Sequence, residues 1–326
     1  PRHVGLKAGV PIDRGALGVN RLCGSGFQSW VNAAQMIQTG EAQIVLAGGV
    51  EQMSQIPYVL RGARWGYRMG QNEVEDYLTA ALTDSYTNTP MAITAENLAE
   101  KYKLSRLDAD TYALQSQTRF KKAFEKGIFK EEISPYKIEN PKGAVTVEKD
   151  EHPRPEATLE GLQKLKAVFK KDGTVTAGNA SGIVDGAAAS VLMSEEEAKR
   201  RQLKPLARIV SYASVGCDPS IMGIGPVGAI KKALQKADMT LGQMDLIEVN
   251  EAFASQFLAV QKELGLDNEI TNVNGGAIAV GHPLGASGTR IMNHLMYELA
   301  RRQKKYAIGS ACIGGGQGIA IVIERL

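Results

Sequence analysis

A cysteine at the start of a helical pattern is the feature of this sequence that most directly suggests chemistry. Cys23 lies in NRLCGSGF (residues 20–27), between an apolar run at 16–19 that predicts the end of a strand and apolar residues at helical spacing over 27–39. Unpaired backbone N–H groups and the positive end of the helix dipole meet at such a turn, which lowers the pKa of a thiol and favours the nucleophilic thiolate. The alternative is a cysteine that packs as a small buried hydrophobe. This stretch alone leaves both interpretations open.

Three further stretches place polar groups on turns that follow predicted strands. They are NEAF (250–253), GHPLG (281–285) and SACIGGG (310–316). Taken singly, Asn250 could cap a helix, His282 could be a hydrogen-bonded loop histidine, and the glycines could form a flexible turn. Turns at strand ends are where α/β proteins build sites. Together the four stretches supply two thiols, an imidazole, an amide and backbone N–H donors, which is the set that acyl transfer needs.

Alternating strand and helix patterns must hold these turns in place. Strands are predicted over 42–49, 144–147, 186–193, 206–215, 246–249, 306–312 and 318–323, and helices over 27–39, 90–103, 105–126, 228–237, 250–264 and 287–302. Ser105 with Asp108 suits the beginning of one helix, and Ser194 before three glutamates suits the beginning of another. The alternation predicts an α/β protein with mixed, mostly parallel sheets.

The two ends of the chain resemble each other. The stretches that begin at Cys23 and at Pro283 both run through a Gly/Ser turn, an amphipathic helix, a buried strand and glycines, and 182–195 parallels 314–326. This repeat predicts duplicated α/β domains with layered helices. We assign 1–52 with 180–204 to an N-terminal domain and 205–326 to a C-terminal domain. Residues 53–179 contain more charge and little strand, which predicts an inserted loop domain that acts as a lid or binding subdomain.

The repeat also bears on where the chain begins. The turn at Gly285 follows about 80 residues of its half, whereas the turn at Gly24 follows 23, so the repeat predicts that roughly 55 residues of the first half are absent. Their loss would expose apolar surface on the first sheet. We therefore expect this chain alone to be poorly stable.

Composition excludes several classes of protein. Three cysteines in 326 residues are too few for a disulfide framework, and a net charge of +3 is too small to indicate nucleic acid binding. The apolar runs are shorter than a membrane span requires. Lysines and arginines gather over 119–130 and 164–171. They indicate either a solvated surface or an attraction for an anionic ligand such as a nucleotide.

The motifs NRLCGSG, NEAF, GHPLGASG and CIGGGQG, in this order and spacing, resemble those of the thiolase family. The resemblance covers essentially the whole chain, including GNASGIVDGAAA (178–189) and the insertion. Within the family, PMAITAENLA (90–99), DEHPRP (150–155) and CDPSIMGIGPV (217–227) are most similar to the mitochondrial-type 3-ketoacyl-CoA thiolases, which are acetyl-CoA acyltransferases. Four ordered motifs make the resemblance highly specific.

The resemblance implies a division of catalytic roles. Cys23 would take the acyl group from a 3-ketoacyl-CoA, and His282 would activate it and help to hold the enolate oxygen of the departing acetyl-CoA. Asn250 would fix a water beside that oxygen, with Glu251 in support. Cys312 would protonate the enolate, or deprotonate acetyl-CoA in the reverse Claisen condensation. The N–H groups of Cys23 and Gly314 would form the other oxyanion hole, around the acylated cysteine. Carbon–carbon cleavage generates a carbanion equivalent, so it needs two oxyanion sites and a matched acid.

The resemblance also implies how substrates bind. Arg154 would lie near the nucleotide of CoA, Ser181 near its pantetheine and Met91 by the acyl pocket. Pro90 stands where short-chain biosynthetic thiolases often have a histidine, which favours the degradative direction. Coenzyme A would be a substrate, with no permanently bound cofactor and no metal. The expected assembly is a homodimer or homotetramer, in the mitochondrial matrix or the bacterial cytoplasm.

Three alternatives stay open at this stage. A biosynthetic acetoacetyl-CoA thiolase would use the same residues. A condensing enzyme of the ketoacyl synthase type shares the doubled α/β plan but is disfavoured by a second cysteine acid at Cys312. A truncated, inactive CoA-binding form is the third. Cys217 receives no role, and His3, His152 and His294 are interpreted as structural or exposed.

Overall fold

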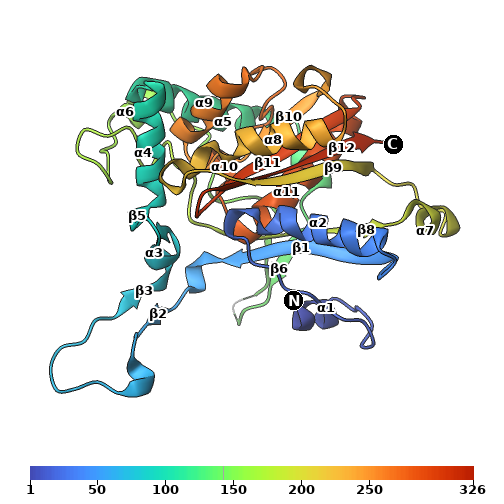
Figure 1. The fold of residues 1–326 in the computed structure, drawn as a ribbon, viewed down its shortest axis with the longest axis horizontal. Helices are drawn as coiled ribbons and strands as arrows, with labels where there is room; N and C mark the ends of the chain where they lie inside the picture. The colour runs from blue at the N-terminus through green and yellow to red at the C-terminus, as the bar shows by residue number, and fades with distance from the viewer. Residues whose placement is uncertain (142) are drawn as a thin grey trace.

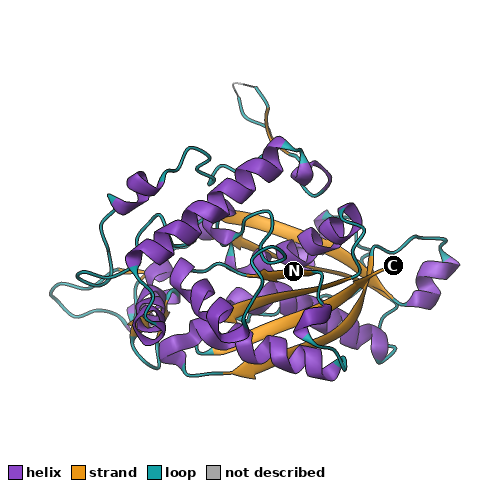
Figure 2. Ribbon diagram, turned by 90° about the horizontal axis from the view of Figure 1, so that it is seen from above, coloured by secondary structure: helices purple, strands orange, loops and turns teal. Residues whose placement is uncertain are grey.

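Two sheets with a pair of helices between them make the centre of the molecule. The computed structural model describes residues 1–141 and 143–326. Helices α2 and α11 lie between the two-stranded sheet β1–β8 and the four-stranded sheet β10-β11-β12-β9, and further helices cover the outer face of the larger sheet (Figures 1 and 2). The bounds are α2 Ser25–Gln38, β1 Ile44–Gln52, β8 Asp185–Met193, β9 Ala207–Gly216, β10 Leu246–Val249, α11 Leu284–Arg301, β11 Tyr306–Ile313 and β12 Gln317–Arg325.

The strand pairing corrects one part of the predicted fold class. The α/β class is confirmed, but among the described strands only β10 and β11 pair in parallel, and β1–β8, β11–β12 and β12–β9 are antiparallel. A turn of three residues joins β11 to β12, and so short a connection can return only an antiparallel strand. Gly315 and Gly316 both have φ +81, which glycine adopts without strain. The expectation of mostly parallel sheets was therefore wrong.

Two apolar clusters fill the layers. The first lies between the sheets and is built mainly from α2, α11, β11 and β12, with Phe27, Ile291 and Ile321 fully buried. The second lies on the outer face of the larger sheet, under α8 (Gly225–Lys236), α9 (Ala254–Leu264) and α5 (Arg106–Glu125). The apolar faces of the helices therefore pack against both faces of the four-stranded sheet.

Helices α2 and α11 cross at a pair of glycines. A Cβ atom built on Gly26 would lie 2.6 Å from the Thr289 backbone nitrogen, and one built on Gly288 would lie 2.3 Å from the Phe27 nitrogen. Neither position can hold a larger residue unless the backbones separate. The contact brings the first turns of the two helices, which follow Cys23 and His282 in the chain, next to each other.

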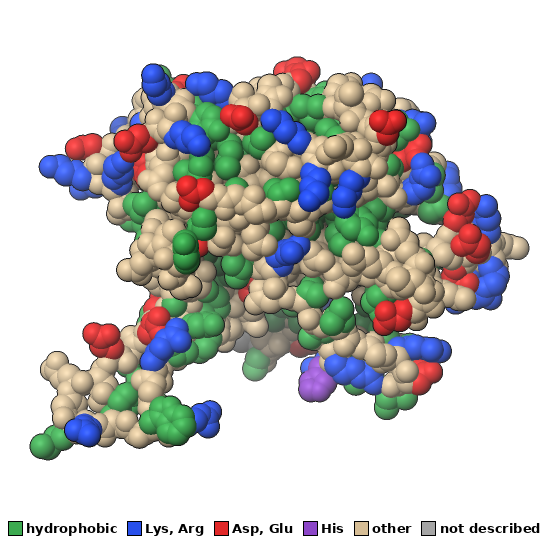
Figure 3. Space-filling model, in the orientation of Figure 1, with side chains coloured by type: hydrophobic (Ala, Val, Ile, Leu, Met, Phe, Trp, Pro, Cys, Tyr) green, Lys and Arg blue, Asp and Glu red, His purple; other side chains and the backbone are tan. Residues whose placement is uncertain are grey.

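The inserted segment contributes to the core as well as to the surface. Helix α4 (Met91–Tyr102) and α5 pack against α9, and Tyr112 stacks on Phe257 with ring centroids 4.3 Å apart. The predicted beginning of α5 is confirmed, because Ser105 and Asp108 form a capping box. Residues between β2 (Tyr58–Val59) and β3 (Glu75–Asp76) project as an arm (Figure 1) that bears exposed apolar and basic side chains (Figure 3). The insertion is therefore more than a lid.

Several shorter elements complete the chain. They are α1 Arg2–Lys7, α3 Tyr77–Ala81, β4 Thr83–Asp84, β5 Thr89–Pro90, β6 Tyr136–Ile138, β7 Val145–Val147, α6 Leu159–Gln163, α7 Glu195–Arg200 and α10 Ala277–Val280. The run 16–19, expected to end a strand, has no strand structure, since no described strand pairs with it. Ser194 caps α7 as predicted.

The smaller sheet has an exposed apolar side. Leu46, Val50 and Val191 are all about half exposed or more. None of the described helices is both long enough and apolar enough to cross a bilayer.

Candidate active site

Cys23 lies in a short 3-10 turn, Leu22–Gly24, immediately before α2. Leu22 has φ +47, an uncommon conformation for a residue with a side chain, so the turn is held under strain. The backbone N–H groups of Gly314 and of Cys23 itself lie near the sulfur and favour the thiolate, but burial outweighs them and raises the pKa of Cys23 to about 11. Cys23 is therefore a neutral thiol in the free protein near pH 7, and it needs a base to become a nucleophile.

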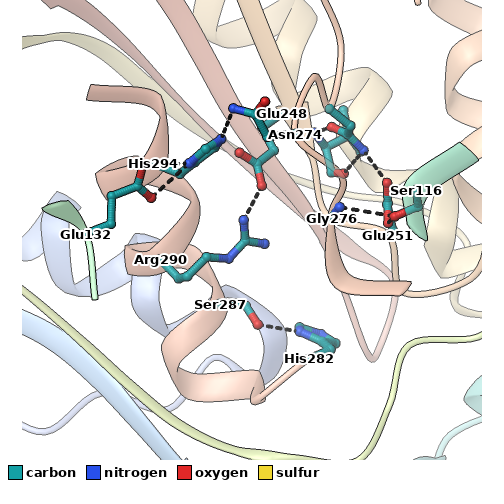
Figure 4. A network of polar contacts seen from close by, with 12 residues as sticks. Ser116, Glu132, Glu248, Glu251, Asn274, Gly276, His282, Ser287, Arg290 and His294 are labelled. Atoms are coloured by element: carbon teal, nitrogen blue, oxygen red, sulfur yellow. Dashed lines mark hydrogen bonds and ion pairs between the residues drawn. The ribbon is translucent and has the colours of Figure 1, made fainter. Parts of the chain in front are cut away.

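His282 is the candidate base, and both of its ring nitrogens have protein partners. Its Nδ1 lies 2.6 Å from Ser287 Oγ, and its Nε2 lies 3.2 Å from Asn250 Nδ2 (Figure 4 shows the serine contact). Burial, together with the nearby positive charge of Arg290, lowers the pKa of His282 to about 3. The imidazole is therefore neutral at physiological pH and able to accept a proton.

Asn250 follows β10 directly, and its N–H donates to Ser310 O at 2.9 Å, which ties the end of β10 to β11. It is not a helix cap, because α9 begins only at Ala254. Its side chain is 1% exposed, and its Oδ1 has no hydrogen-bond donor among the described residues. The amide is thus held beside His282 with an oxygen able to accept from a water or ligand.

Cys312, near the end of β11, is the second thiol. It is fully buried and packs with Met222 and Ala252. Burial raises the pKa of Cys312 well above its usual value, and the nearby Cys23 and Cys217 thiols raise it further. A thiol with such a high pKa holds its proton until a strongly basic carbon or sulfur removes it.

The residues expected to bind substrate are not all equally close to this centre. Met91 packs with the Cys312 cluster, and its Sδ lies 3.5 Å from the Cβ position of Gly314. The Ser181 N–H donates to Ala252 O at 3.0 Å, which places Ser181 beside the NEAF turn. Arg154 is exposed, and its guanidinium donates to three backbone carbonyls of 151–153. Met91 and Ser181 therefore border the centre, whereas Arg154 lies on a loop with its side chain folded back.

Glu251 points away from the thiols, toward the insertion. Its carboxylate accepts hydrogen bonds from Tyr112 and Ser116 of α5 at 2.7 Å each, and from Asn272 and the Ile278 N–H at 3.1 Å each. Four donors surround it, and no cation among the described residues forms an ion pair with it. Its place fits a role in fixing the NEAF turn against α5 and does not fit direct contact with reacting atoms.

Sequence reasoning missed a polar row on α11. Ser287, Arg290 and His294 lie on one face of this helix, at spacings of three and four residues, and contact His282, Glu248 and Glu132 respectively (Figure 4). His294, expected to be structural or exposed, is buried. The spacing of these residues was visible in the sequence, but which of them meets His282 depends on the fold. No group of His, Cys, Asp or Glu that could hold a metal ion occurs within the described ranges 1–141 and 143–326.

Comparison with known proteins gives consistent matches. The family model "Thiolase, N-terminal domain" matches residues 1–196, and "Thiolase, C-terminal domain" matches residues 203–325. The mitochondrial 3-ketoacyl-CoA thiolase of Mus musculus is 60% identical over 325 residues, which are 99% of this chain and 82% of the mouse protein. An acetyl-CoA acetyltransferase of Shinella zoogloeoides is 49% identical over 326 residues, 100% of this chain and 83% of that protein. The crystal structure of the human mitochondrial 3-ketoacyl-CoA thiolase in complex with CoA superposes with a TM-score of 0.96 at 59% identity, covering 100% of this chain and 82% of the human one.

Proposed function

This chain belongs to the thiolase family, and from that premise we propose that it cleaves 3-ketoacyl-CoA with CoA to give acetyl-CoA and a shortened acyl-CoA. The enzyme is an acetyl-CoA C-acyltransferase, and its relatives include both 3-ketoacyl-CoA thiolases and acetyl-CoA acetyltransferases. The reaction is reversible. In the opposite direction it is a Claisen condensation.

In the first half of the reaction, the Cys23 sulfur attacks the 3-keto carbon while its proton moves to His282 Nε2. The N–H groups of Cys23 and Gly314, which lie near the sulfur, would hold the oxyanion that forms there. The bond between C2 and C3 then breaks, and its electron pair becomes the enolate of acetyl-CoA. His282 and a water held by Asn250 would bind the enolate oxygen, and the Cys312 thiol would protonate C2.

In the second half, the thiol of free CoA attacks the acyl group on Cys23. The CoA proton passes to the Cys312 thiolate, and the Cys23 thiolate recovers a proton from His282. Every group then returns to its starting state, which a covalent two-step mechanism requires. Neither cysteine can replace the other, since one carries the acyl group while the other carries a proton.

One observation carries this proposal. Two backbone N–H donors reach the sulfur of Cys23, and a buried neutral imidazole and an amide are held together by contacts from three separate stretches of the chain. Preorganised donors beside a neutral thiol and a neutral base suit a reaction in which negative charge develops only at the transition state.

The remaining proposals concern ligands and setting. Coenzyme A and acyl-CoA are the substrates, with Ser181 at the pantetheine, Met91 at the acyl chain and Arg154 at the nucleotide once its side chain unfolds from the backbone. The three-domain division, a homodimer or homotetramer, and a place in the mitochondrial matrix or the bacterial cytoplasm are proposed on the family resemblance. Light scattering after gel filtration tests the assembly.

Intact-mass spectrometry tests the central claim. The protein is mixed with acetoacetyl-CoA or a longer 3-ketoacyl-CoA, and the adduct is located by peptide mapping. An acyl group on Cys23 that free CoA removes supports the mechanism. A protein that binds CoA but gains no adduct contradicts it. Equal or better rates with acetoacetyl-CoA than with longer chains would favour the acetyltransferase branch, to which the 49% identical relative belongs.

A further inference from the structure

A buried serine contacts the ring nitrogen of His282 that points away from the amide of Asn250. Ser287, in the first turn of α11, places its Oγ 2.6 Å from His282 Nδ1 and 3.0 Å from Pro283 O (Figure 4). Ser287 is 1% exposed and His282 is 5% exposed, so water does not compete freely for either contact. The serine is thus the partner that decides which proton arrangement of the imidazole is favourable.

The Ser287 hydroxyl has two possible orientations in this contact. A serine hydroxyl has one proton, and it can donate to Pro283 O while accepting from His282 Nδ1–H, or it can rotate and donate to a bare Nδ1. The Pro283 carbonyl already accepts the N–H groups of Ala286 and Ser287, each at 2.9 Å. It therefore loses nothing essential when the hydroxyl turns away, and neither orientation leaves a buried backbone group without a partner.

The corresponding serine of the first half shows what an ordinary turn serine does. The glycine that follows Ser25, Gly26, meets the glycine that follows Ser287, Gly288, at the crossing of α2 and α11. Ser25 Oγ accepts from the Arg21 N–H at 2.9 Å and donates to Leu22 O at 2.8 Å, so both of its partners are backbone groups. In the second half, an imidazole nitrogen occupies the place of that N–H. The serine of the second half therefore contacts a side chain that the reaction uses, where the serine of the first half contacts only the backbone.

The chemistry proposed above keeps hydrogen on His282 Nδ1 in both half-reactions. When Cys23 gives up its proton, Nε2 must be bare and Nδ1 must carry hydrogen, which Ser287 favours by accepting. While an acyl group occupies Cys23, His282 holds the proton from Cys23 on Nε2, where it can donate to the enolate oxygen, and its Nδ1–H still donates to Ser287. Asn250 can present either end of its amide, because its Oδ1 has no other donor among the residues that the structure describes.

We propose that Ser287 is a positioning residue that holds the His282 ring and, by accepting from Nδ1–H, keeps Nε2 bare for the Cys23 proton and stabilises the imidazolium once that proton has arrived. This inference rests on the proposed function. No covalent step is added, since the serine hydroxyl keeps its own proton throughout. Fixing a histidine tautomer through the nitrogen remote from the reacting atoms is worth about 10- to 100-fold in activity where it has been measured at metal sites, and we expect an effect of that order here.

Three variants test the inference. Ser287→Ala removes the hydroxyl, Ser287→Thr keeps one, and Ser29→Ala is the matched control, because the Ser29 hydroxyl also donates to a backbone carbonyl of its own helix, Gly26 O at 2.8 Å, with no imidazole beside it. For each, kcat and KM for CoA, the single-turnover rate of Cys23 acylation and the urea midpoint of unfolding are measured. We expect Ser287→Ala to lower kcat about 10- to 100-fold with KM for CoA within about threefold of the parent. Ser287→Thr should recover most of the loss, and Ser29→Ala should equal the parent.

Nuclear magnetic resonance of protein labelled with ¹⁵N-histidine gives a readout independent of turnover. The parent should show His282 as a single tautomer protonated at Nδ1, and Ser287→Ala should show a mixture. A kcat for Ser287→Ala within twofold of the parent would overturn the inference. So would equal losses in the alanine and threonine variants with parallel loss of stability, which would reveal a purely structural role. If the parent itself forms no acyl adduct, the proposed function fails first, and the tautomer measurement still decides the role of Ser287.

Discussion

The two halves of the molecule repeat one plan but place it in different surroundings. In each half a helix, α2 or α11, is followed by a strand, β1 or β11, that pairs antiparallel with a second strand of nine residues, β8 or β12. Strands β11 and β12 lie between β10 and β9, whereas among the described strands β1 and β8 pair only with each other. At matching positions, Val191 is 59% exposed and Ile323 is fully buried. Local sequence determines the pairing, and neighbouring strands determine the burial.

The chemistry divides along the same line. The first half supplies Cys23, which remains partly accessible, and the second half supplies His282, Asn250 and Cys312, all 5% exposed or less. An acyl group must reach its attachment point from outside, whereas proton transfer groups work best where water is excluded. The two halves thus share one arrangement of helix and strands, and the difference in burial matches the different roles of the groups that they carry.

Removing the first-half thiol should have the largest effect. Cys23→Ala leaves no atom to carry the acyl group, so we expect thiolysis to fall on the order of 10⁴-fold or more. The measurement is the initial rate with a 3-ketoacyl-CoA, together with intact mass. An acyl adduct that persists in this variant would show that another residue is the nucleophile.

Removing the second-half thiol should separate the two roles. Cys312→Ala should still accept an acetyl group on Cys23 from acetyl-CoA, because CoA can leave as a thiolate that takes its proton from solvent, whereas the enolate carbon depends on Cys312. Carbon–carbon bond formation and cleavage should fall about 10²- to 10⁴-fold, the usual contribution of an acid or base. Adduct formation and condensation are measured side by side. Equal loss of both activities would break the proposed division between the halves.

Stability should distinguish the two strand pairs. Ile323→Ala creates a cavity in the core between the sheets and should cost about 2–5 kcal/mol in the free energy of unfolding. Val191→Ala, at the matching place on β8, should change it by less than about 0.5 kcal/mol. Urea unfolding followed by circular dichroism measures both. A comparable loss at Val191 would mean that the exposed side of β1–β8 is covered in solution.

The dependence on pH sharpens the comparison at the thiols themselves. Since the pKa of Cys23 is raised to about 11, its thiolate fraction, and hence its alkylation rate by iodoacetamide, should rise about tenfold per pH unit from pH 6 to 9. The pKa of His282 is lowered to about 3, so no inflection from that imidazole should appear in this range. Cys312 should react far more slowly because it is buried. Peptide mapping of labelled protein measures the alkylation rates of Cys23 and Cys312 at each pH. A plateau in the Cys23 rate below pH 9 would show that the pKa of Cys23 is lower.

Much of the fold was predictable from the sequence because it is encoded locally. The capping box at Ser105, the Ser194 cap and the buried strand 246–249 depend on residues close in the chain, and the structure shows each of them. The prediction of mostly parallel sheets was wrong because alternation of strands and helices does not reveal that three residues join β11 to β12. The strand expected at 16–19 had the right composition but lacks a described partner.

The site was predictable in its members more than in their contacts. Motif spacing pointed to Cys23, His282, Asn250 and Cys312, and the roles of these residues stay predictions until the variants above are measured. Sequence did not reveal that Glu251 faces Tyr112 and Ser116 of the insertion, more than a hundred residues away. Nor did it single out Ser287, since a serine in a first helical turn usually has only backbone partners.

The contact between Gly26 and Gly288 also limits how this protein can change. With no room for a methyl group on either helix, a substitution at one glycine cannot be compensated by a smaller residue at the other. The turns that carry Cys23 and His282 lie just before these two glycines, so this contact fixes how far apart they are held, and we expect variation in substrate preference to arise elsewhere. The loops of the insertion are where new specificities could be selected or engineered without disturbing the relation between the thiol and the imidazole.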